Sequence, residues 1–399
     1  MSLKELIQSV LSVIEHGSHE EVMAAPRGWI VKEKGLYVTD IAKYNQFLEM
    51  IYGADKVVSS RFSRVTIFEF LNKQFPKLKI SNQEVEFDEK LFFKDFYDVK
   101  PRNLLVTAPI SGIRLDGGVK NFELSIYKFG YLQDLQFPIA NESGMYVSVL
   151  VKNIYDKVKA VQKANDAFLN LAKIIVFMSG KLDRSISIET GLPLKPSVSH
   201  EQMYVSTSSH QVSDEGGPLD WANIKNELRE KIPVNNSFFS ENTDFRKLWV
   251  LYGKKHNGEK LNDLESRILN SALALGESAI TNDTRNSIIY TCISLEILFS
   301  LDEGGLFQKS IGEKLSDVFS FIVAKDVEAR LEVGRLVKKV YGLRSAIVHG
   351  GDKELSNENL VVNFFMRLAI NELLNGERFS AVTSLKDIYE LLKRAQNSY

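Results

Sequence analysis

The chain has 399 residues, of which 50 are lysine or arginine and 51 are aspartate or glutamate, so its formal net charge at pH 7 is −1. No overall positive field draws such a protein to nucleic acid, and any binding of RNA must depend on a local patch. The single cysteine, Cys292, excludes a disulfide framework and a cysteine-based zinc cluster, and it fits a reducing compartment.

The first segment, residues 1–21, places apolar side chains at helical spacing among polar ones. This pattern predicts an amphipathic helix. It is not typical of a secretory signal, because a basic start and a small-residue cleavage site are missing. No apolar run approaches the roughly 20 residues needed to cross a bilayer, so we expect a soluble, cytoplasmic protein with no membrane contact.

The remainder of residues 1–215 predicts a mixed α/β domain. Strands are expected over 29–40, 103–115, 121–129 and 144–152, where β-branched residues or an alternation of polar and apolar residues are bounded by turn residues.

Further signals in this half concern its connections. Asp116-Gly117-Gly118 predicts a hairpin between the second and third of these strands. A long helix is expected over 155–178, followed over 179–218 by one or two short strands and a linker rich in Ser, Gly and Pro. The aromatic stretch 87–97 is interpreted as core and hairpin edge.

Residues 216–399 predict an all-α bundle. Helical spacing of apolar residues continues over 219–232, 241–253, 261–278, 282–300, 306–322, 327–349, 357–374 and 381–395. The expected protein is therefore α+β, with a mixed N-terminal domain of sensing or regulatory role followed by a helical bundle. Trp221, Trp249 and Tyr252 are expected to be packing anchors between the two domains.

The helix expected over 327–349 carries the chemistry, in the run Tyr341-Gly-Leu-Arg344-Ser345-Ala-Ile-Val-His349-Gly350-Gly351. Arg344 interrupts an apolar stripe, and a guanidinium there needs a partner because it cannot lose its charge. Glu296 is the one inward acid on an otherwise apolar helix, so we expect it to bind Arg344. The alternative is that Glu296 caps a helix or pairs with a lysine at the rim of the bundle.

His349 is the last helical residue before two glycines, a strong helix stop. A fixed cation for phosphate and an imidazole for proton transfer are what a metal-independent ribonuclease needs. Five residues turn a helix by about 140°, so one helix alone makes an awkward site. Two such helices about a two-fold axis could surround one phosphate, and we therefore expect a homodimer formed through the bundle. The lysine run Lys338-Lys339 could follow a phosphate backbone, although such runs are more often a solvated helix face.

At Tyr341-x-x-Arg344-Ser345-x-Ile347-Val348-His349-Gly350 the chain resembles the HEPN superfamily, and particularly its Apea-like branch. The signature of that superfamily is an arginine, four to six residues, and a histidine. The upstream helix, which starts at Asp283-Thr-Arg285 and contains Leu295-Glu296-x-Leu298-Phe299, is also similar to that branch. The resemblance covers residues 261–392, about a third of the chain.

The resemblance implies a dimeric helical bundle that, in active members, cleaves RNA without metal or cofactor. The ribose 2′-hydroxyl attacks the adjacent phosphate and leaves a cyclic phosphate. His349 would be the general acid or base, and Arg344 would stabilise the phosphorane, with Tyr341, Ser345 and Glu296 in support. Many active relatives carry Asn or Asp where this chain has Ser345, which can still donate a hydrogen bond.

Two functions follow. Many HEPN proteins belong to toxin–antitoxin or anti-phage defence systems, so the first is a HEPN-type endoribonuclease that acts as such an effector on RNA. The second is a non-catalytic module that dimerises and binds RNA or a protein partner, as in inactive HEPN domains. The enzyme requires Arg344 and His349 at an open cleft lined by the dimer, whereas the module would bury His349 or turn it away.

Overall fold

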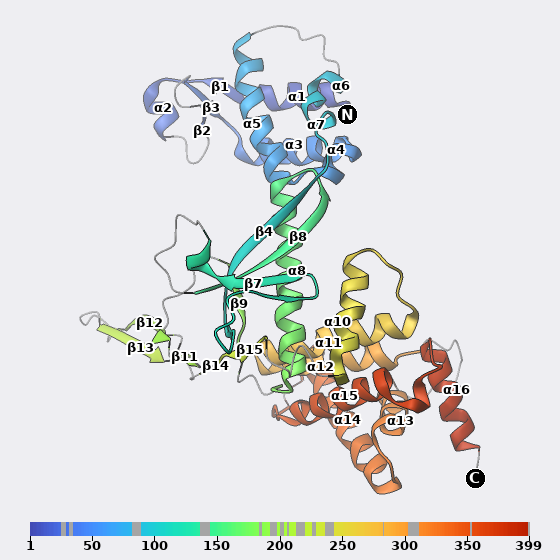
Figure 1. Cartoon of the computed structure of the whole chain (residues 1–399). Helices are drawn as coiled ribbons and strands as arrows, with labels where there is room; N and C mark the ends of the chain where they lie inside the picture. The colour runs from blue at the N-terminus through green and yellow to red at the C-terminus, as the bar shows by residue number, and fades with distance from the viewer. Residues whose placement is uncertain are drawn as a thin grey trace. The chain divides into compact units, whose positions relative to one another are not determined.

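A computed structural model describes residues 1–24, 29–31, 35–81, 89–135, 144–182, 186–191, 198–199, 203–205, 207–212, 220–225, 229–235, 243–281, 283–301, 311–351 and 353–397. The fold is α+β, as the sequence predicts, with a five-stranded antiparallel sheet and a C-terminal helical bundle (Figure 1). The chain divides into two compact units. The first comprises Met1–Val106 and Leu150–Asp166, and the second comprises Thr107–Val149 and Ala167–Tyr399.

The first unit is mostly helical. Its helices are α1 (Leu3–Ser12), α2 (His19–Ala24), α3 (Ile41–Ala54), α4 (Lys56–Arg61), α5 (Arg64–Ser81), α6 (Glu89–Phe92) and α7 (Lys94–Tyr97). Strands β1 (Ile14–His16), β2 (Trp29–Val31) and β3 (Leu36–Val38) form an antiparallel sheet in the order β1-β3-β2. Three elements contribute residues to both units, namely β4 (Arg102–Ser111), β8 (Met145–Ile154) and α8 (Lys157–Ser179).

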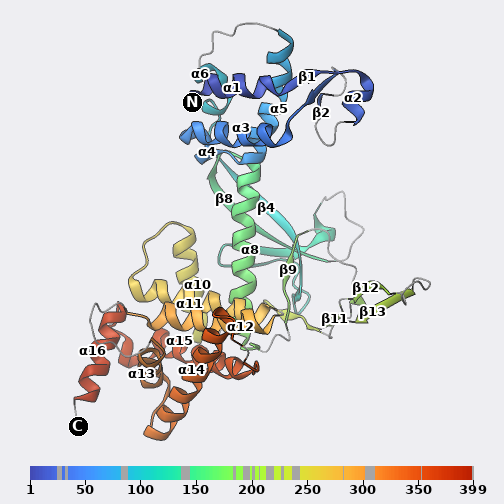
Figure 2. The ribbon, with the colours of Figure 1, turned by 180° about the vertical axis from the view of Figure 1, so that it is seen from behind.

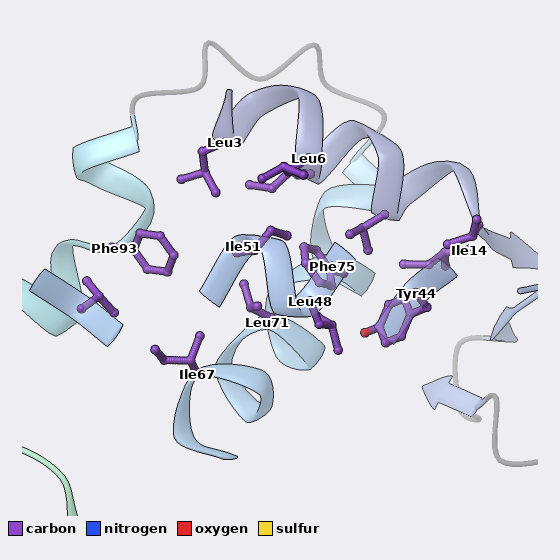
Figure 3. Close-up of a cluster of buried hydrophobic side chains, with 14 of the residues drawn as sticks. Leu3, Leu6, Ile14, Tyr44, Leu48, Ile51, Ile67, Leu71, Phe75 and Phe93 are labelled. Atoms are coloured by element: carbon purple, nitrogen blue, oxygen red, sulfur yellow. The ribbon is translucent and has the colours of Figure 1, made fainter. Parts of the chain in front are cut away.

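The core of the first unit forms where α1, α3 and α5 pack together (Figure 3). The buried residues of α1 recur at helical spacing, and α3 and α5 each contribute a similar stripe. The labelled members of this core are Leu3, Leu6, Ile14, Tyr44, Leu48, Ile51, Ile67, Leu71, Phe75 and Phe93. The described part of the aromatic stretch 87–97, residues 89–97, contributes Phe93 and Phe96 to this core, and it forms α6 and α7 where a hairpin edge is expected.

The amphipathic helix predicted over residues 1–21 is shorter in the structure. Helix α1 ends at Ser12, and Ile14 pairs with Val38 as part of β1. Ile14 is fully buried in the core, so the pairing of β1 with β3 satisfies its backbone in place of helical hydrogen bonds. The helical periodicity of the sequence could not reveal this partner strand.

The antiparallel sheet has the strand order β6-β7-β8-β4-β9, where β6 is Phe122–Leu124, β7 is Tyr127–Tyr131 and β9 is Glu189–Thr190. The hairpin predicted between 103–115 and 121–129 is wrong. Segment 121–129 turns back on itself at Ser125, whose φ is +56°, so β6 pairs with β7 and not with β4. Helix α8 is confirmed within one or two residues of its predicted ends.

Seven shorter described strands pair outside the five-stranded sheet and the β1-β3-β2 sheet. They are β5 (Ile113–Arg114), β10 (Val198–Ser199), β11 (Met203–Val205), β12 (Thr207–Val212), β13 (Asp220–Lys225), β14 (Arg229–Glu230) and β15 (Ile232–Pro233). They pair as β5 with β15, β12 with β13, and β10-β11-β14. The helix predicted over 219–232 is therefore wrong, because β12 provides a cross-strand partner for residues 220–225 that a local window cannot detect.

The bundle comprises α10 (Thr243–His256), α11 (Asp263–Ile280), α12 (Thr284–Phe299), α13 (Ile311–Val323), α14 (Val327–Val348), α15 (Glu358–Asn375) and α16 (Leu385–Gln396). Figures 1 and 2 show it from opposite sides, with α11 and α12 side by side in both. Helix α12 packs against α11, α13, α14 and α15, so it is central in the bundle, in agreement with its largely apolar surface. Short 3-10 turns occur at Leu132–Asp134 and Glu377–Phe379.

A buried network of hydroxyl and amide groups joins α11, α12 and α15. Ser278 exchanges hydrogen bonds of 2.9 Å with Ser287, each hydroxyl donating to the other residue's carbonyl. Asn363 of α15 donates to the Ser278 hydroxyl at 3.1 Å and accepts from Thr291 at 2.7 Å. Asn359 donates to Ser287 at 2.9 Å. All five residues are fully buried, so losing one partner costs about 1–3 kcal/mol per unsatisfied group.

Helices α8 and α11 are in backbone contact at Gly276. A methyl group at this position would collide with the backbone carbonyl of Lys173. The Lys173 ammonium also forms an ion pair of 2.8 Å with the Glu277 carboxylate, beside the crossing. Glycine is therefore required here because the two helix backbones touch.

An aromatic cluster binds the sheet to the bundle inside the second unit. The Tyr127 and Tyr252 rings stack at 6.0 Å with their hydroxyls 2.9 Å apart, and the Trp249 ring meets Tyr127 edge-on at 6.4 Å. Trp249 and Tyr252 are anchors, as predicted, whereas the side chain of Trp221 lies outside the described residues. This packing explains why the units do not divide near residue 215, where the sequence places the boundary.

Lysines and arginines cap the carboxyl ends of six helices from neighbouring elements. Each donates to the last carbonyl groups of a helix, where the macrodipole favours a cation. The donors and acceptors are Lys79 to Leu11, Lys159 to Ser59 and Ser60, Arg367 to Phe177 and Met178, Arg267 to Ile297 and Ser300, Arg378 to Phe321 and Ile322, and Lys247 to Leu374. Among the described helices, none combines the length and apolar character that a membrane span requires.

The Gly276→Ala substitution should destabilise the second unit by about 1–3 kcal/mol, because a methyl group cannot fit between the two backbones. Urea unfolding followed by far-ultraviolet circular dichroism measures this change. Gly342→Ala on α14 is the matched control, since its methyl group would come no closer than 3.7 Å to the Lys353 Nζ. That variant should be neutral or more stable by up to about 1 kcal/mol. Equal stabilities for the two variants would contradict the close contact.

Candidate functional site

Helix α14 is held in the bundle by a buried apolar face and ends where the sequence predicts. Asp326 caps its first turn by accepting from the Ala329 N–H at 2.8 Å. At the other end His349 is the capping residue, and Gly350 takes the left-handed conformation with φ +72°. The Gly351 N–H then donates to the Ala346 carbonyl at 2.7 Å, the closing bond of a Schellman motif.

Glu296 of α12 binds two residues of α14. Its Oε1 accepts a hydrogen bond of 2.7 Å from the Tyr341 hydroxyl and lies 3.8 Å from Nη2 of Arg344. The Arg344 guanidinium also lies 5.7 Å from the centre of the Tyr341 ring, within cation–π range. The ion pair predicted between Glu296 and Arg344 is therefore present, and the alternative of a lysine at the bundle rim is not needed.

The Arg344 guanidinium remains open to solvent on one side. The Arg344 side chain is 32% exposed and that of Glu296 is 30% exposed. A guanidinium has five N–H donors, and an ion pair as long as 3.8 Å engages it weakly. The carboxylate thus neutralises and positions Arg344 while leaving donors available to an incoming anion.

Tyr341 is kept protonated by its surroundings. Burial raises its pKa to about 12, and its hydrogen bond to the Glu296 carboxylate acts in the same direction. At neutral pH the phenol therefore stays a hydrogen-bond donor to Glu296. The motif placed Tyr341 among the supporting residues, but its contact with Glu296 was not foreseen, although a spacing of three residues from Arg344 places both on one helix face.

The two remaining candidates, Ser345 and His349, are exposed at the end of α14. The Ser345 carbonyl accepts from the His349 N–H at 3.0 Å, which is a backbone contact. Among the described residues, neither side chain forms a hydrogen bond or an ion pair with Glu296, Tyr341 or Arg344. The structure brings together three of the five candidates and presents the other two to solvent.

A surface hollow of about 360 Å³ between α14 and α15 was not predicted from the sequence. Arg335, Lys339, Glu358 and Phe365 are among its lining residues. The Lys339 ammonium forms an ion pair with Glu358, and this contact lowers the pKa of the Glu358 carboxyl. Lys339 is therefore already paired, which weakens the Lys338-Lys339 run as a phosphate-binding strip.

Cys292 lies one helical turn before Glu296 and is fully buried. Burial raises the pKa of its thiol to about 12, and the nearby Glu296 carboxylate acts in the same direction. Its Sγ lies 3.9 Å from the Val340 carbonyl oxygen of α14. The cysteine therefore packs at the α12–α14 contact as an inert side chain.

The chain was compared with protein-family models, curated proteins and solved structures. None of them matches it. The HEPN resemblance therefore rests on the residues of the motif alone. In the part of the chain that the structure describes, no cluster of three or more His, Cys, Asp or Glu residues could hold a metal ion.

Removing the Glu296 carboxylate should destabilise the bundle. Glu296→Ala leaves the Tyr341 hydroxyl without its acceptor and Arg344 without its counter-charge, at a cost of about 2 kcal/mol. Tyr341→Phe should cost about 1 kcal/mol, and a double-mutant cycle in urea should give a coupling energy of about 1 kcal/mol between the two positions. Tyr290→Phe, at a half-buried tyrosine of α12, is the control and should change little. Additive effects of the two substitutions would argue against the contact.

The Cys292 thiol should react only when the protein unfolds. Burial raises the pKa of this thiol to about 12, so almost none of it is thiolate near pH 8, and its neighbours also exclude the reagent. Alkylation by iodoacetamide at pH 8, followed by mass spectrometry, should be at least about 10²-fold slower than for the urea-unfolded chain. Comparable rates for folded and unfolded protein would contradict the burial.

Proposed function

We propose that the protein is a metal-independent endoribonuclease of HEPN type that acts in the cytoplasm as a toxin or anti-phage defence effector. The observation that carries this proposal is the arrangement on α14. Arg344 is fixed by Glu296 yet partly open to solvent, and five residues later the exposed His349 ends the helix. A guanidinium of this kind can bind a phosphate, and a solvent-facing imidazole can exchange a proton with RNA.

The proposed reaction needs no group beyond the RNA itself. The 2′-hydroxyl loses its proton and attacks the adjacent phosphorus, while the 5′-oxygen of the next nucleotide leaves and takes up a proton. His349 acts as the general base or acid in these transfers. Arg344 stabilises the extra negative charge on the pentacoordinate phosphorus, and Glu296 and Tyr341 act through Arg344 as positioning residues. Ser345 donates a hydrogen bond at the phosphate.

The exposure of His349 favours an enzyme over a purely structural helix end. A non-catalytic module should bury this histidine or engage it within the fold, and the structure leaves it exposed. One observation favours the second function, a HEPN-like dimerisation and binding module, because Arg344 already has a partner in Glu296. A homodimer about a two-fold axis through the bundle serves both functions, since it brings two copies of the α14 end together.

The test is cleavage of end-labelled single-stranded RNA and transfer RNA in EDTA. Wild type should cleave and leave 2′,3′-cyclic phosphate ends. Arg344→Ala should lower the rate about 10²–10³-fold, and His349→Ala about 10²–10⁴-fold. Arg246→Ala and His256→Ala, at exposed positions of α10, are matched controls and should keep wild-type activity.

Two other outcomes have distinct meanings. If folded, dimeric wild type binds RNA or a protein but does not cleave RNA, the protein is the non-catalytic binding module and not the enzyme. Equal cleavage by wild type and both α14 variants would identify a contaminating nuclease and remove the site. Deletion of residues 1–212 cannot test the sensing or regulatory role expected for the N-terminal domain, because it would also remove the five-stranded sheet and α8, whose residues belong partly to the second unit.

A further inference from the structure

The first unit contains a hollow of about 390 Å³ that none of the preceding chemistry uses. It lies among the end of α4, the end of β8 and the first turns of α8, and all of its lining residues belong to the first unit. Its volume is in the range of small-ligand sites in proteins. Three of its nine lining residues are cationic and one is anionic, and this charge indicates the class of ligand that it fits.

Helix α8 supplies one wall of this hollow. Lys159, Gln162, Lys163 and Asp166 all line it, and their spacing of three, one and three residues places them on one helix face. Arg61, the last residue of α4, adds a third cation. Three cations therefore face one carboxylate, and among the described residues neither Arg61 nor Lys163 forms an ion pair. When the Asp156 carboxylate near Lys159 is counted as well, three cations still face two carboxylates, which favours an anionic ligand.

Lys159 is held rigidly in the wall. Its ammonium donates to the Ser59 carbonyl at 2.8 Å and the Ser60 carbonyl at 2.6 Å, which fixes it at the end of α4. These contacts use two of its three N–H bonds. Burial lowers the pKa of Lys159, the nearby Asp156 opposes this shift, and the like charge of Lys163 adds to it. A bound anion would relieve the repulsion between the two lysines.

Arg61 is preorganised by an aromatic ring. Its guanidinium lies 4.7 Å from the centre of the Tyr155 ring, and Tyr155 in turn packs near Phe62 with ring centres 6.3 Å apart. Stacking on a ring face holds the guanidinium plane and leaves its edge donors free for the fork-like contact that phosphate accepts. Tyr155 also lines the hollow and contributes a flat apolar surface to it.

Asn153 enters the hollow from the end of β8 in a strained backbone conformation. Its φ is +53°, in the left-handed region, and its N–H donates to the Asn103 side chain at 3.1 Å. Asparagine tolerates this conformation better than most residues, yet the backbone still stores strain of a kind that recurs at ligand sites. The amides of Asn153 and Gln162 each offer donors and an acceptor, which a base edge or a ribose can use.

We propose that this hollow binds a phosphorylated nucleotide, either free or as one unit of an RNA strand. The phosphate lies against Arg61 and Lys163 beside the fixed Lys159 ammonium. The amides of Asn153 and Gln162 contact the ribose and base, and the Asp166 carboxylate accepts from an amino group of the base. The volume and the amides favour a nucleotide over inorganic phosphate alone. This inference goes beyond the ribonuclease proposal and does not depend on it, because no residue of α12 or α14 takes part.

The test measures binding to the full chain by isothermal titration calorimetry. The probes are 5′-AMP, adenosine, inorganic phosphate and a nine-nucleotide single-stranded RNA with 2′-O-methyl groups, which cannot undergo attack by a 2′-hydroxyl. The variants are Lys163→Gln and Arg61→Gln. Lys157→Gln is the control, at an exposed lysine of the same helix that does not line the hollow. Thermal unfolding of each variant checks that it is folded.

Both variants should weaken binding about tenfold or more, while the control binds like wild type. Binding of 5′-AMP, with competition by phosphate and little binding of adenosine, identifies a free nucleotide. Binding of the oligonucleotide alone identifies an RNA strand, and the slope of log K against log salt should then fall by about 0.7 in Lys163→Gln. Both results support the site.

The proposal is overturned if folded wild type binds none of the four probes. It is also overturned if Lys163→Gln and Arg61→Gln bind as tightly as wild type, because the anion then binds elsewhere. If Lys157→Gln weakens binding as much as Lys163→Gln, the effect depends on net charge alone, and the hollow is not the binding site.

Discussion

The buried hydroxyl and amide network fixes α12, and the candidate site depends on where α12 lies. Ser287 and Thr291 face α11 and α15 through hydrogen bonds that allow little rotation or sliding. The opposite face of the same helix then meets α14, first through Cys292 and one turn later through Glu296. A purely apolar seam could repack in several registers, whereas unsatisfied buried hydroxyls make other registers costly. The hydrogen bonds on one face of α12 therefore fix Glu296 on the opposite face, and Glu296 in turn fixes the position of Arg344.

Glu296 gives Arg344 two properties that are hard to combine. A half-buried guanidinium without a counter-charge would be unstable, and a fully neutralised one would have little attraction for phosphate. The 3.8 Å ion pair, shared with the Tyr341 hydroxyl, lies between these limits. Because Tyr341 stays protonated well above neutral pH, it competes with Arg344 for the same carboxylate oxygen at all physiological pH values. The arrangement suits a cation that must be held in place and still accept a ligand.

Local rules predicted the bundle well and the long-range pairing poorly. Helical spacing located α11 to α16 because each buries one face against its neighbours, and a lone acid and a lone arginine in apolar stripes sufficed to pair Glu296 with Arg344. Strand β13 was mistaken for helix because its partner β12 lies in a polar segment, and β6 was paired wrongly because Ser125 turns without a glycine. The hollow around Lys159 and Arg61 could not be foreseen, since its residues come from segments about 100 positions apart. Features formed by residues close together in the sequence were predictable, whereas features formed by residues far apart in the sequence were not.

The cations that cap helix ends change what the charge of this protein means. Lys79, Lys159 and Lys247, like Arg267, Arg367 and Arg378, direct their charges at carbonyl groups inside the fold. They count in the sum of basic residues but contribute less to the field that an approaching polyanion meets. A reagent that acetylates lysines would therefore act on two different populations. At some positions it would loosen the end of a helix, and at others it would only remove a surface charge, so its effect on folding and its effect on ligand binding would follow different lysines.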